Sequence, residues 1–289
     1  MPNTRDIRNR IRGVKNTQKI TRAMQLVASS KMKKAQDRAL EGRPYARQLA
    51  RMLESLTDKV EDFSHPFLEE REVKKRGILL ISTDRGLCGP LNSNLFREVM
   101  QMEGDIAYVT IGKKARQFIS RTGRKLIADF PISEQAQFKE LRPVIELLIE
   151  QFNEGEIDSI EILYPRFKNT LIQEPVLVPL LPLTALEDYV KDLAEKEGMH
   201  LVEDNRELVF EPAAEEILTK LLDRFVKREA YQMLVDARAS EHSARMVAMK
   251  AATDNAKKLT DSLTLQYNKA RQAGITQEIL EITAASQHS

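Results

Sequence analysis

Apolar residues recur with helical spacing over the first sixty positions. Two sets of three follow the 4,3 spacing of a coiled-coil seam: Ile7, Ile11 and Val14, and then, on a slightly rotated face, Ile20, Met24 and Val27. Polar Gln18, Thr21 and Gln25 interrupt a strict heptad. The pattern therefore predicts a long helix from Thr4 to about Lys59 that forms an irregular coiled coil, with a bend at Pro44.

The pattern changes after a charged, aperiodic stretch at residues 61–76, which we interpret as a linker. The run Gly77–Ser82 is continuously apolar, as in a strand buried on both faces of a parallel sheet. Strands and helices then alternate, which indicates βαβ units and a mostly parallel sheet. Predicted strands are 106–111, 126–130, 157–164 and 175–181, with an edge strand at 203–210; predicted helices are 90–102, 113–121 and 140–152.

A second long helical pattern follows Pro212. Its predicted seam is built mainly from small residues: Ala244, Ala248, Ala252 and Ala256, followed by Leu259 and Leu263. The ~70 residues from Ala213 onward would span on the order of 100 Å as a helix. Two such helices, at opposite ends of a chain with a domain between them, can pair only in antiparallel fashion.

The expected fold class is therefore α/β with long helices. An antiparallel coiled coil of the N- and C-terminal helices carries a small Rossmann-like α/β domain inserted between them. The expected boundaries are residues 1–60 for the first coiled-coil helix, 61–210 for the globular domain and 211–289 for the second helix. Alanine at a seam buries little apolar area, so we expect a partner to surround the exposed part of the pair.

Composition narrows the class of protein. The chain has 289 residues, 42% of them hydrophobic and 30% charged, which excludes a disordered tail or a collagen-like protein. Cys88 is the single cysteine, which excludes a disulfide scaffold and a cysteine-based zinc cluster. No apolar run reaches membrane-spanning length, and residues 1–6 have no apolar signal core. We expect a soluble protein that is not exported.

The net charge of the chain is only +2, but the charges are distributed unevenly along it. Residues 1–53 hold 14 Lys and Arg against 3 Asp and Glu, a net +11, so the remainder carries −9. The basic segment is either a solvated helix face or a surface for an acidic partner, which could be protein, nucleic acid or lipid headgroup.

Residues 82–89 join the first strand to a helix, where α/β folds often bind ligands. Gly86 and Gly89 are too few for a dinucleotide fingerprint, and no Lys-Ser or Lys-Thr follows to form a phosphate loop. We interpret the segment as a structural turn; a catalytic or anion site is the alternative. His65, His200, His242 and His288 have no metal-ligand spacing and are expected at the surface or in caps. We predict no catalytic residue, no cofactor and no metal.

Several blocks together resemble the gamma subunit of rotary F-type ATP synthases. They occur at both ends and in the middle of the chain, at residues 7–11, 17–24, 27–32, 84–89, 239–246 and 275–282. The resemblance implies a non-catalytic subunit of the proton-translocating complex, namely a central shaft that couples proton-driven rotation to ATP synthesis or hydrolysis. The implied partners are the alpha and beta subunits, epsilon and the membrane c-ring, with neither nucleic acid nor directly bound nucleotide.

The resemblance also implies contact residues. Arg271, Gln272 and Thr276 match positions that grip a loop of one beta subunit, and Met24 matches a contact on the N-terminal helix across from them. Ile275, Ile279 and Ile282, spaced 4 and 3, would form an apolar stripe at the tip. The lack of a transit peptide favours a peripheral location on the cytoplasmic face of a bacterial membrane.

Two alternatives remain at this point. The basic helix could serve a coiled-coil nucleic-acid-binding protein, although the segment lacks aromatic stacking residues. The turn from Asp84 to Gly89 could serve a small α/β enzyme.

Overall fold

The computed structural model describes residues 4–42, 44–45, 48–49, 52–53, 64–183 and 214–287. The chain divides into two compact units. We call residues Met1–Ser30 with Arg245–Ser289 the coiled-coil unit, and residues Lys31–Ala244 the sheet unit. The helices α1 (Thr4–Glu41) and α7 (Ala214–Gln287) each contribute to both units.

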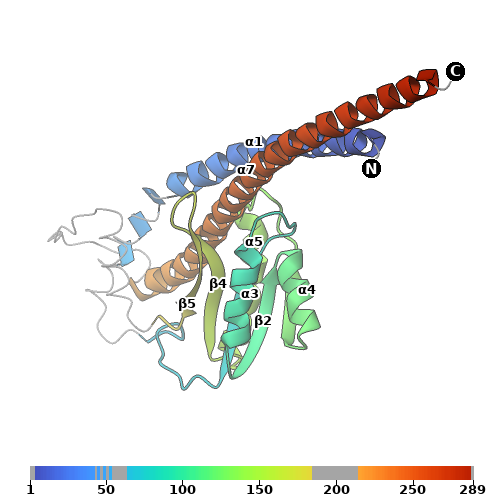
Figure 1. Ribbon diagram of the computed structural model, residues 1–289. Helices are drawn as coiled ribbons and strands as arrows, with labels where there is room; N and C mark the ends of the chain where they lie inside the picture. Colours follow the sequence, from blue (N-terminus) through green and yellow to red (C-terminus); the bar gives the residue numbers. More distant parts are fainter. Residues whose placement is uncertain are drawn as a thin grey trace. The chain divides into compact units, whose positions relative to one another are not determined.

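The sheet unit contains a five-stranded sheet of order β3-β2-β1-β4-β5 (Figure 1). The first four strands are parallel to their neighbours and β5 is antiparallel to β4, which confirms the predicted mostly parallel sheet. The strands are β1 (Lys75–Ile81), β2 (Asp105–Ile111), β3 (Lys125–Phe130), β4 (Ser159–Phe167) and β5 (Gln173–Leu181); the helices between them are α3 (Leu91–Gln101), α4 (Lys113–Arg121) and α5 (Phe138–Asn153).

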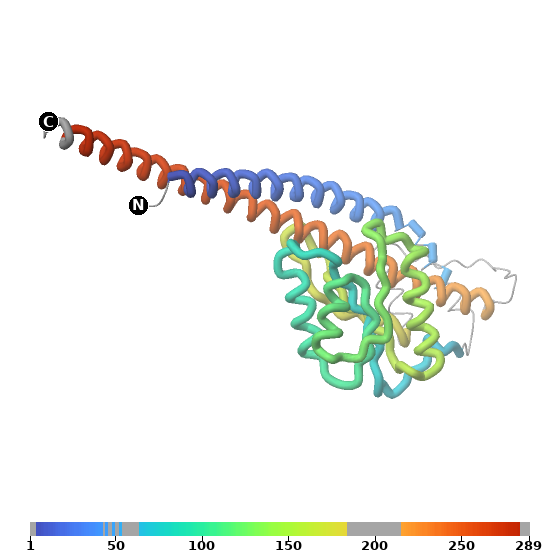
Figure 2. Tube along the Cα trace, turned by 90° about the vertical axis from the view of Figure 1, so that its right-hand side faces the viewer, coloured from blue at the N-terminus to red at the C-terminus, as the bar shows by residue number. Residues whose placement is uncertain are grey.

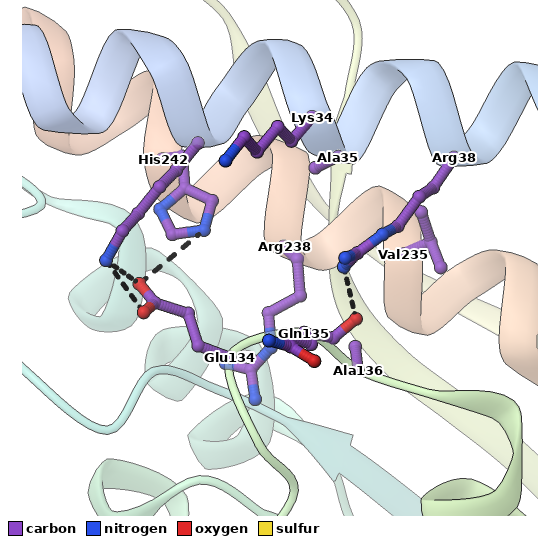
Figure 3. A pocket seen from close by; sticks show the side chains of 10 residues that line it. Lys34, Ala35, Arg38, Glu134, Gln135, Ala136, Val235, Arg238 and His242 are labelled. Carbon is purple, nitrogen blue, oxygen red and sulfur yellow. Dashed lines mark hydrogen bonds and ion pairs between the residues drawn. The ribbon is translucent and has the colours of Figure 1, made fainter.

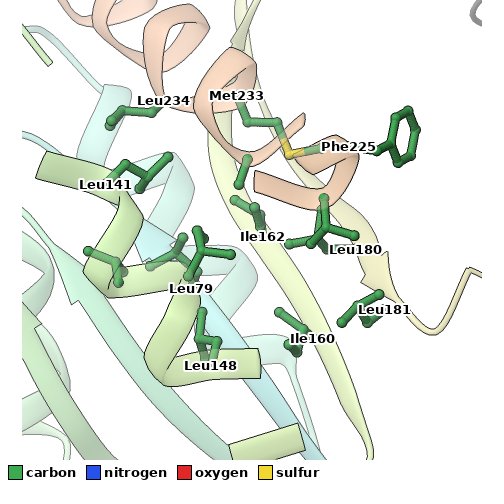
Figure 4. Close-up of a cluster of buried hydrophobic side chains, with 14 of the residues drawn as sticks. Leu79, Leu141, Leu148, Ile160, Ile162, Leu180, Leu181, Phe225, Met233 and Leu234 are labelled. Carbon is green, nitrogen blue, oxygen red and sulfur yellow. The ribbon is translucent and has the colours of Figure 1, made fainter. Parts of the chain in front are cut away.

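The central strand β1 is buried on both faces, as its continuous apolar run predicts. Leu79 and Ile81 point to one side, where they pack with residues of α5 and the first part of α7. Figure 4 shows this cluster, in which Leu148 and Leu234 come from those two helices. Ile78 belongs to a second cluster on the opposite side, formed with α3 and α4. The sheet is therefore a middle layer between two pairs of helices.

Local sequence chemistry fixes the ends of these elements. Gln137 and Glu140 form a reciprocal capping box at the start of α5. Gly112, between β2 and α4, has a φ of 98°, and a Cβ there would lie 2.4 Å from the Ser82 carbonyl oxygen. Only glycine permits this approach. It lets Ser82 Oγ accept a 2.8 Å hydrogen bond from the Ala115 amide, so the end of β1 is tied to the start of α4.

Residues 64–76, the described part of the stretch predicted as a linker, are more ordered than their charge suggests. Phe67 is only 4% exposed and packs edge-on against Phe152 of α5. Its carbonyl accepts a 2.6 Å hydrogen bond from the Leu183 amide, and β1 already begins at Lys75. A single aromatic in a charged run gives no periodic signal, which is why the sequence pattern missed this anchor. The predicted strand at 203–210 lies outside the described residues.

In the coiled-coil unit the two helices run antiparallel and side by side (Figure 2). Two hydrogen bonds establish the register. The Thr21 and Thr253 hydroxyls lie 2.7 Å apart, and Arg8 Nη2 donates to the Tyr267 hydroxyl. Moving forward along α1 therefore means moving backward along α7, as predicted.

The α1 side of the seam differs from the prediction. Ile20 and Val27, expected at the seam, are 60% and 54% exposed. The inward positions instead keep an unbroken 3,4 spacing through the polar residues: Thr4, Ile7, Ile11, Val14, Gln18, Thr21, Gln25 and Ala28. Thr21 is buried there because its hydroxyl pairs with that of Thr253, so the polar residue costs little.

The α7 side of the seam is also shifted relative to the prediction. Leu259 is 50% exposed, and Ala248 and Ala252 are half-buried. The residues that face α1 again alternate by four and three: Met249, Thr253, Ala256, Thr260, Leu263 and Tyr267. The observed seam is thus a regular heptad of small, hydroxylated and apolar side chains, and the expected irregular coiled coil was wrong on this point.

The helix ends also need one correction. α1 ends at Glu41, before Gly42, and not as one helix near Lys59. Residues 44–45, 48–49 and 52–53 are again helical, so the helix is interrupted at Gly42, two residues before the bend predicted at Pro44. Gly13 and Gly274 interrupt neither long helix.

The regular seam predicts that Ala256→Leu destabilises the helix pair by about 1 to 3 kcal/mol, because a leucine overpacks a position that is 8% exposed. Leu259→Ala, three residues along, should change stability by less than about 0.5 kcal/mol because Leu259 faces solvent. Urea unfolding of the full-length chain, followed by circular dichroism, measures both. Equal costs would mean that the register is different.

The buried carboxyl of Asp236 on α7 should make the stability of the chain depend on pH. Burial raises the pKa of its carboxyl from 3.8 to about 6, against the hydrogen bond from the Phe167 amide and the charge of Arg166. The folded state therefore binds the proton more tightly than the unfolded state. This contribution to stability is present below pH 4 and is lost as the pH rises through about 6. Asp236→Asn should stabilise the chain at pH 7.5 and lose that advantage at pH 4, as measured by urea unfolding at both values.

Candidate functional surfaces of the coiled-coil unit

The last part of α7 continues past the start of α1. Because Arg8 faces Tyr267, the antiparallel register puts Thr4 opposite Arg271, and residues 272–287 extend beyond the first described residue of α1 (Figure 2). The apolar side chains of this segment are 49–70% exposed: Ile275, Ile279, Leu280 and Ile282. The predicted stripe of three isoleucines is therefore solvent-facing in the chain alone.

Three of the four predicted contact residues lie at the start of this segment. Arg271, Gln272 and Thr276 are all exposed. The Thr276 hydroxyl donates to the Gln272 carbonyl at 3.0 Å, so its proton is already used in a hydrogen bond within α7. Arg271 lies close enough to Tyr267 that its charge helps to lower the pKa of that phenol, after the larger effect of the hydrogen bond from Arg8.

Met24 is not across from these three residues. Thr21, one turn before Met24, pairs with Thr253, which is 18 residues or roughly 27 Å before Arg271 along α7. The expected juxtaposition is wrong because it ignored the direction of the antiparallel register. Met24 is half-buried at a separate level of the coiled coil.

The outward face of α1, up to Ser30, has two exposed features. Ile20, Leu26 and Val27 are more than half exposed. Exposed cations precede and flank them on the same helix, with Asp6 as the one acidic residue between Thr4 and Ser30: Arg10, Arg12, Lys15, Lys19 and Arg22. An apolar stripe with a basic border suits a protein partner that has an apolar groove and acidic edges.

Within the sheet unit, a group of polar contacts joins the end of α1, the loop before α5 and α7 (Figure 3). Lys31 Nζ forms an ion pair with Glu134 at 2.6 Å, and Arg38 donates to the Gln135 carbonyl. Arg238, which is 5% exposed, donates to Glu241 at 2.9 Å and to the Ile132 carbonyl at 3.2 Å. These contacts surround a cavity of 210 Å³. We call this group the helix joint.

The candidate turn at residues 82–89 is structural. Leu87 and Gly89 both have positive φ values, 63° and 59°, and Cys88 is 1% exposed. Its side chain packs against Leu91 and Ala244, so the turn docks on α7. A buried thiol in this setting is a packing group and not an accessible nucleophile.

The predicted histidine positions are partly wrong. His65 Nδ1 accepts a hydrogen bond from the Phe67 amide, which is a local cap as expected. His242 is only 3% exposed, beside Glu134 in the helix joint. His200 and His288 lie outside the described residues. Across the described ranges, no three His, Cys, Asp or Glu side chains group to hold a metal ion. In the same ranges, no helix has the length and apolarity needed to cross a membrane.

Comparisons with known proteins agree over nearly the whole chain. Residues 3–287 match the family described as ATP synthase. The ATP synthase gamma chain of Opitutus terrae is 54% identical over 99% of this chain and 98% of its own length, and that of Methylacidiphilum infernorum is 46% identical with the same coverage. The chain belongs to the ATP synthase gamma family. As a member it is a non-catalytic central-stalk subunit, a peripheral part of F1, which decides against both the nucleic-acid-binding and the enzyme alternatives.

Solved structures of ATP synthases share the fold. A chain in the Euglena gracilis mitochondrial ATP synthase, OSCP/F1/c-ring, has a TM-score of 0.69 at 19% identity over 98% of this chain and 93% of its own length. A chain in the central stalk/c-ring of the Tetrahymena thermophila enzyme has a TM-score of 0.58 at 26% identity over 81% and 99%. The predicted fold class, an α/β domain inserted between two long helices, is confirmed.

We predict that the buried ion pair of the helix joint contributes most to its stability. Arg238→Met breaks the ion pair with the buried Glu241 carboxylate and the hydrogen bond to the Ile132 carbonyl, so it should cost about 3 to 5 kcal/mol. Arg142→Met breaks the exposed pair with Glu146 and should cost at most about 1 kcal/mol. Urea unfolding compares the two; similar costs would assign the buried pair no special role.

Proposed function

We propose that this stalk subunit is the rotating shaft of an F-type ATP synthase. The coiled-coil unit turns inside a ring of three alpha and three beta subunits, and the sheet unit contacts epsilon and the membrane c-ring. Rotation driven by the ion gradient at the c-ring thereby reaches the beta subunits, where ATP is made or hydrolysed. The rotor, F1/c-ring and central-stalk titles of the structures that share its fold support this assignment.

The observation that carries the proposal is the unequal surface of the coiled-coil unit. One side of α1 is apolar at Ile20 and Val27, other sides are basic, and the end of α7 carries its exposed isoleucines without a paired helix. A shaft can bias three beta subunits toward different states only by making different contacts with each one. A uniform surface would bind all three alike and shift no equilibrium.

We further propose that Arg271, Gln272 and Thr276 contact one beta subunit, and that Met24 makes a second contact at its own level. Arg271 and Gln272 are adjacent and exposed, and Thr276 follows one turn after Gln272. A hydrogen bond from Arg271 to a carboxylate is worth roughly 1.5 to 3 kcal/mol, which is the scale of a useful coupling free energy. The proposed location is the cytoplasmic face of a bacterial cell membrane, which the bacterial origin of the relatives supports.

The double substitution Arg271→Ala with Gln272→Ala tests these contacts. In the assembled complex it should leave nucleotide affinity unchanged and lower both ATP synthesis in vesicles and ATP hydrolysis by detached F1, because beta subunits are less strongly distinguished. Lys269→Ala is the matched control, since Lys269 is exposed on the same helix but points about 160° away from Arg271. Wild-type rates from a fully assembled double variant would remove both residues from the contact surface.

A further inference from the structure

A second cavity of the sheet unit lies where the end of α1, the start of α5 and the first part of α7 meet. Its volume is 750 Å³. The lining combines basic and aromatic side chains with two carboxylates: Arg38, Glu41, Gly42, Tyr45, Phe138, Arg142, Asp223, Arg224, Lys227, Arg228 and Tyr231. Five cations against two anions make it strongly positive.

Arg228 is the unusual member of this lining. It is 8% exposed, and its Nη1 is buried without a hydrogen-bond partner among the described residues. Its guanidinium lies 5.7 Å from the centre of the Tyr231 ring. A Cβ at Gly42 would lie 1.8 Å from Nη2, so the missing side chain at residue 42 is what makes room for the arginine. A buried cation without a counter-ion costs free energy that the ring contact offsets only in part.

The carboxylates near Arg228 are largely engaged elsewhere. Asp223 accepts from Lys227 at 2.8 Å. Glu146, just outside the cavity, pairs with Arg142 at 2.7 Å and with Lys227 at 3.3 Å. Glu41, at the end of α1, is exposed. The cations left to receive a ligand are Arg228 inside the cavity and the exposed Arg224; Arg38 beside them already donates to the Gln135 carbonyl.

We propose that this cavity binds an oxyanion of the phosphate type. Arg228 supplies the buried charge-assisted hydrogen bond, and Arg224 adds a second cation from one turn earlier on α7. Phe138 and Tyr231, in edge-to-face contact at 5.6 Å, form one wall. An anion held there joins α7 to the end of α1 within the sheet unit. The same chemistry fits a free inorganic phosphate or the phosphate group of a nucleotide, whose base would have aromatic rings to stack on.

Thermal unfolding of the full-length chain tests the site independently of its role as a stalk. Inorganic phosphate is titrated against sodium chloride at matched ionic strength, so that general screening is equal in both series. Phosphate should raise the unfolding midpoint of the wild type in a saturable manner, because a ligand that binds only the folded state stabilises it. Arg228→Met should weaken the apparent affinity at least tenfold, and Arg121→Met, on exposed α4 surface, should not.

The sign of the Arg228→Met effect separates a ligand site from a packing role. Without phosphate the variant should be at least as stable as the wild type, since it loses an uncompensated buried charge; with saturating phosphate the wild type should be the more stable. Arg224→Gln, an exposed change that keeps the fold, should weaken phosphate binding by a smaller factor. Equal phosphate shifts in wild type and Arg228→Met, or no saturable shift in the wild type, would overturn the proposal.

A parallel titration with ADP distinguishes the two sources of the anion. If ADP binds more tightly than phosphate, and Tyr231→Leu removes that preference while phosphate binding remains, the ligand is a nucleotide. If both bind alike, it is a free oxyanion. In both cases Arg228→Met must weaken the apparent affinity at least tenfold. An ADP shift that persists in Arg228→Met would contradict the site.

Discussion

The antiparallel register of α1 and α7 is the constraint on which the functional account depends. It is established by the Thr21–Thr253 and Arg8–Tyr267 contacts and maintained by a heptad of small and hydroxylated side chains. Because the helices run in opposite directions, the C-terminal end of α7 extends past the start of α1, and its isoleucines are exposed. The register also separates Met24 from Arg271, so the two proposed contacts lie at two levels along the helix pair.

The packing of the seam leaves the other apolar side chains for partners. About half of the seam positions are alanine, threonine or glutamine, which bury little apolar area, so we expect the helix pair alone to be held weakly. Ile20 and Val27 remain exposed on the outside. The sheet unit has the opposite character. Its central strand is buried on both faces from Gly77 onward. Arg238, through its hydrogen bond to the Ile132 carbonyl, and the buried turn at Cys88 connect α7 to the rest of this unit. The coiled-coil unit thus leaves apolar side chains exposed for partners, whereas the sheet unit is held by its own buried core.

Sequence patterns predicted the fold class well, because the apolar run of β1 and the absence of breakers in α1 and α7 are strong local signals. They misplaced the seam. Ile20 and Val27 have seam spacing, yet apolar spacing alone cannot tell a stripe that packs on the chain's own helix from one that is left for a partner. Phe67 was missed because one aromatic has no period. Arg228 was not predictable, since a lysine- and arginine-rich helix does not reveal which cation lacks a counter-ion.

Single-molecule rotation tests the central claim most directly. A bead is attached through Leu171→Cys, at a loop position of the sheet unit that is 76% exposed. The complex is fixed to a surface by its beta subunits, so the bead reports rotation of this subunit. The native Cys88 is buried and should not react. With ATP present, the account predicts rotation of the bead in one direction in steps of about 120°, as three equivalent beta subunits require. ATP hydrolysis at the normal rate with a bead that does not turn would contradict it.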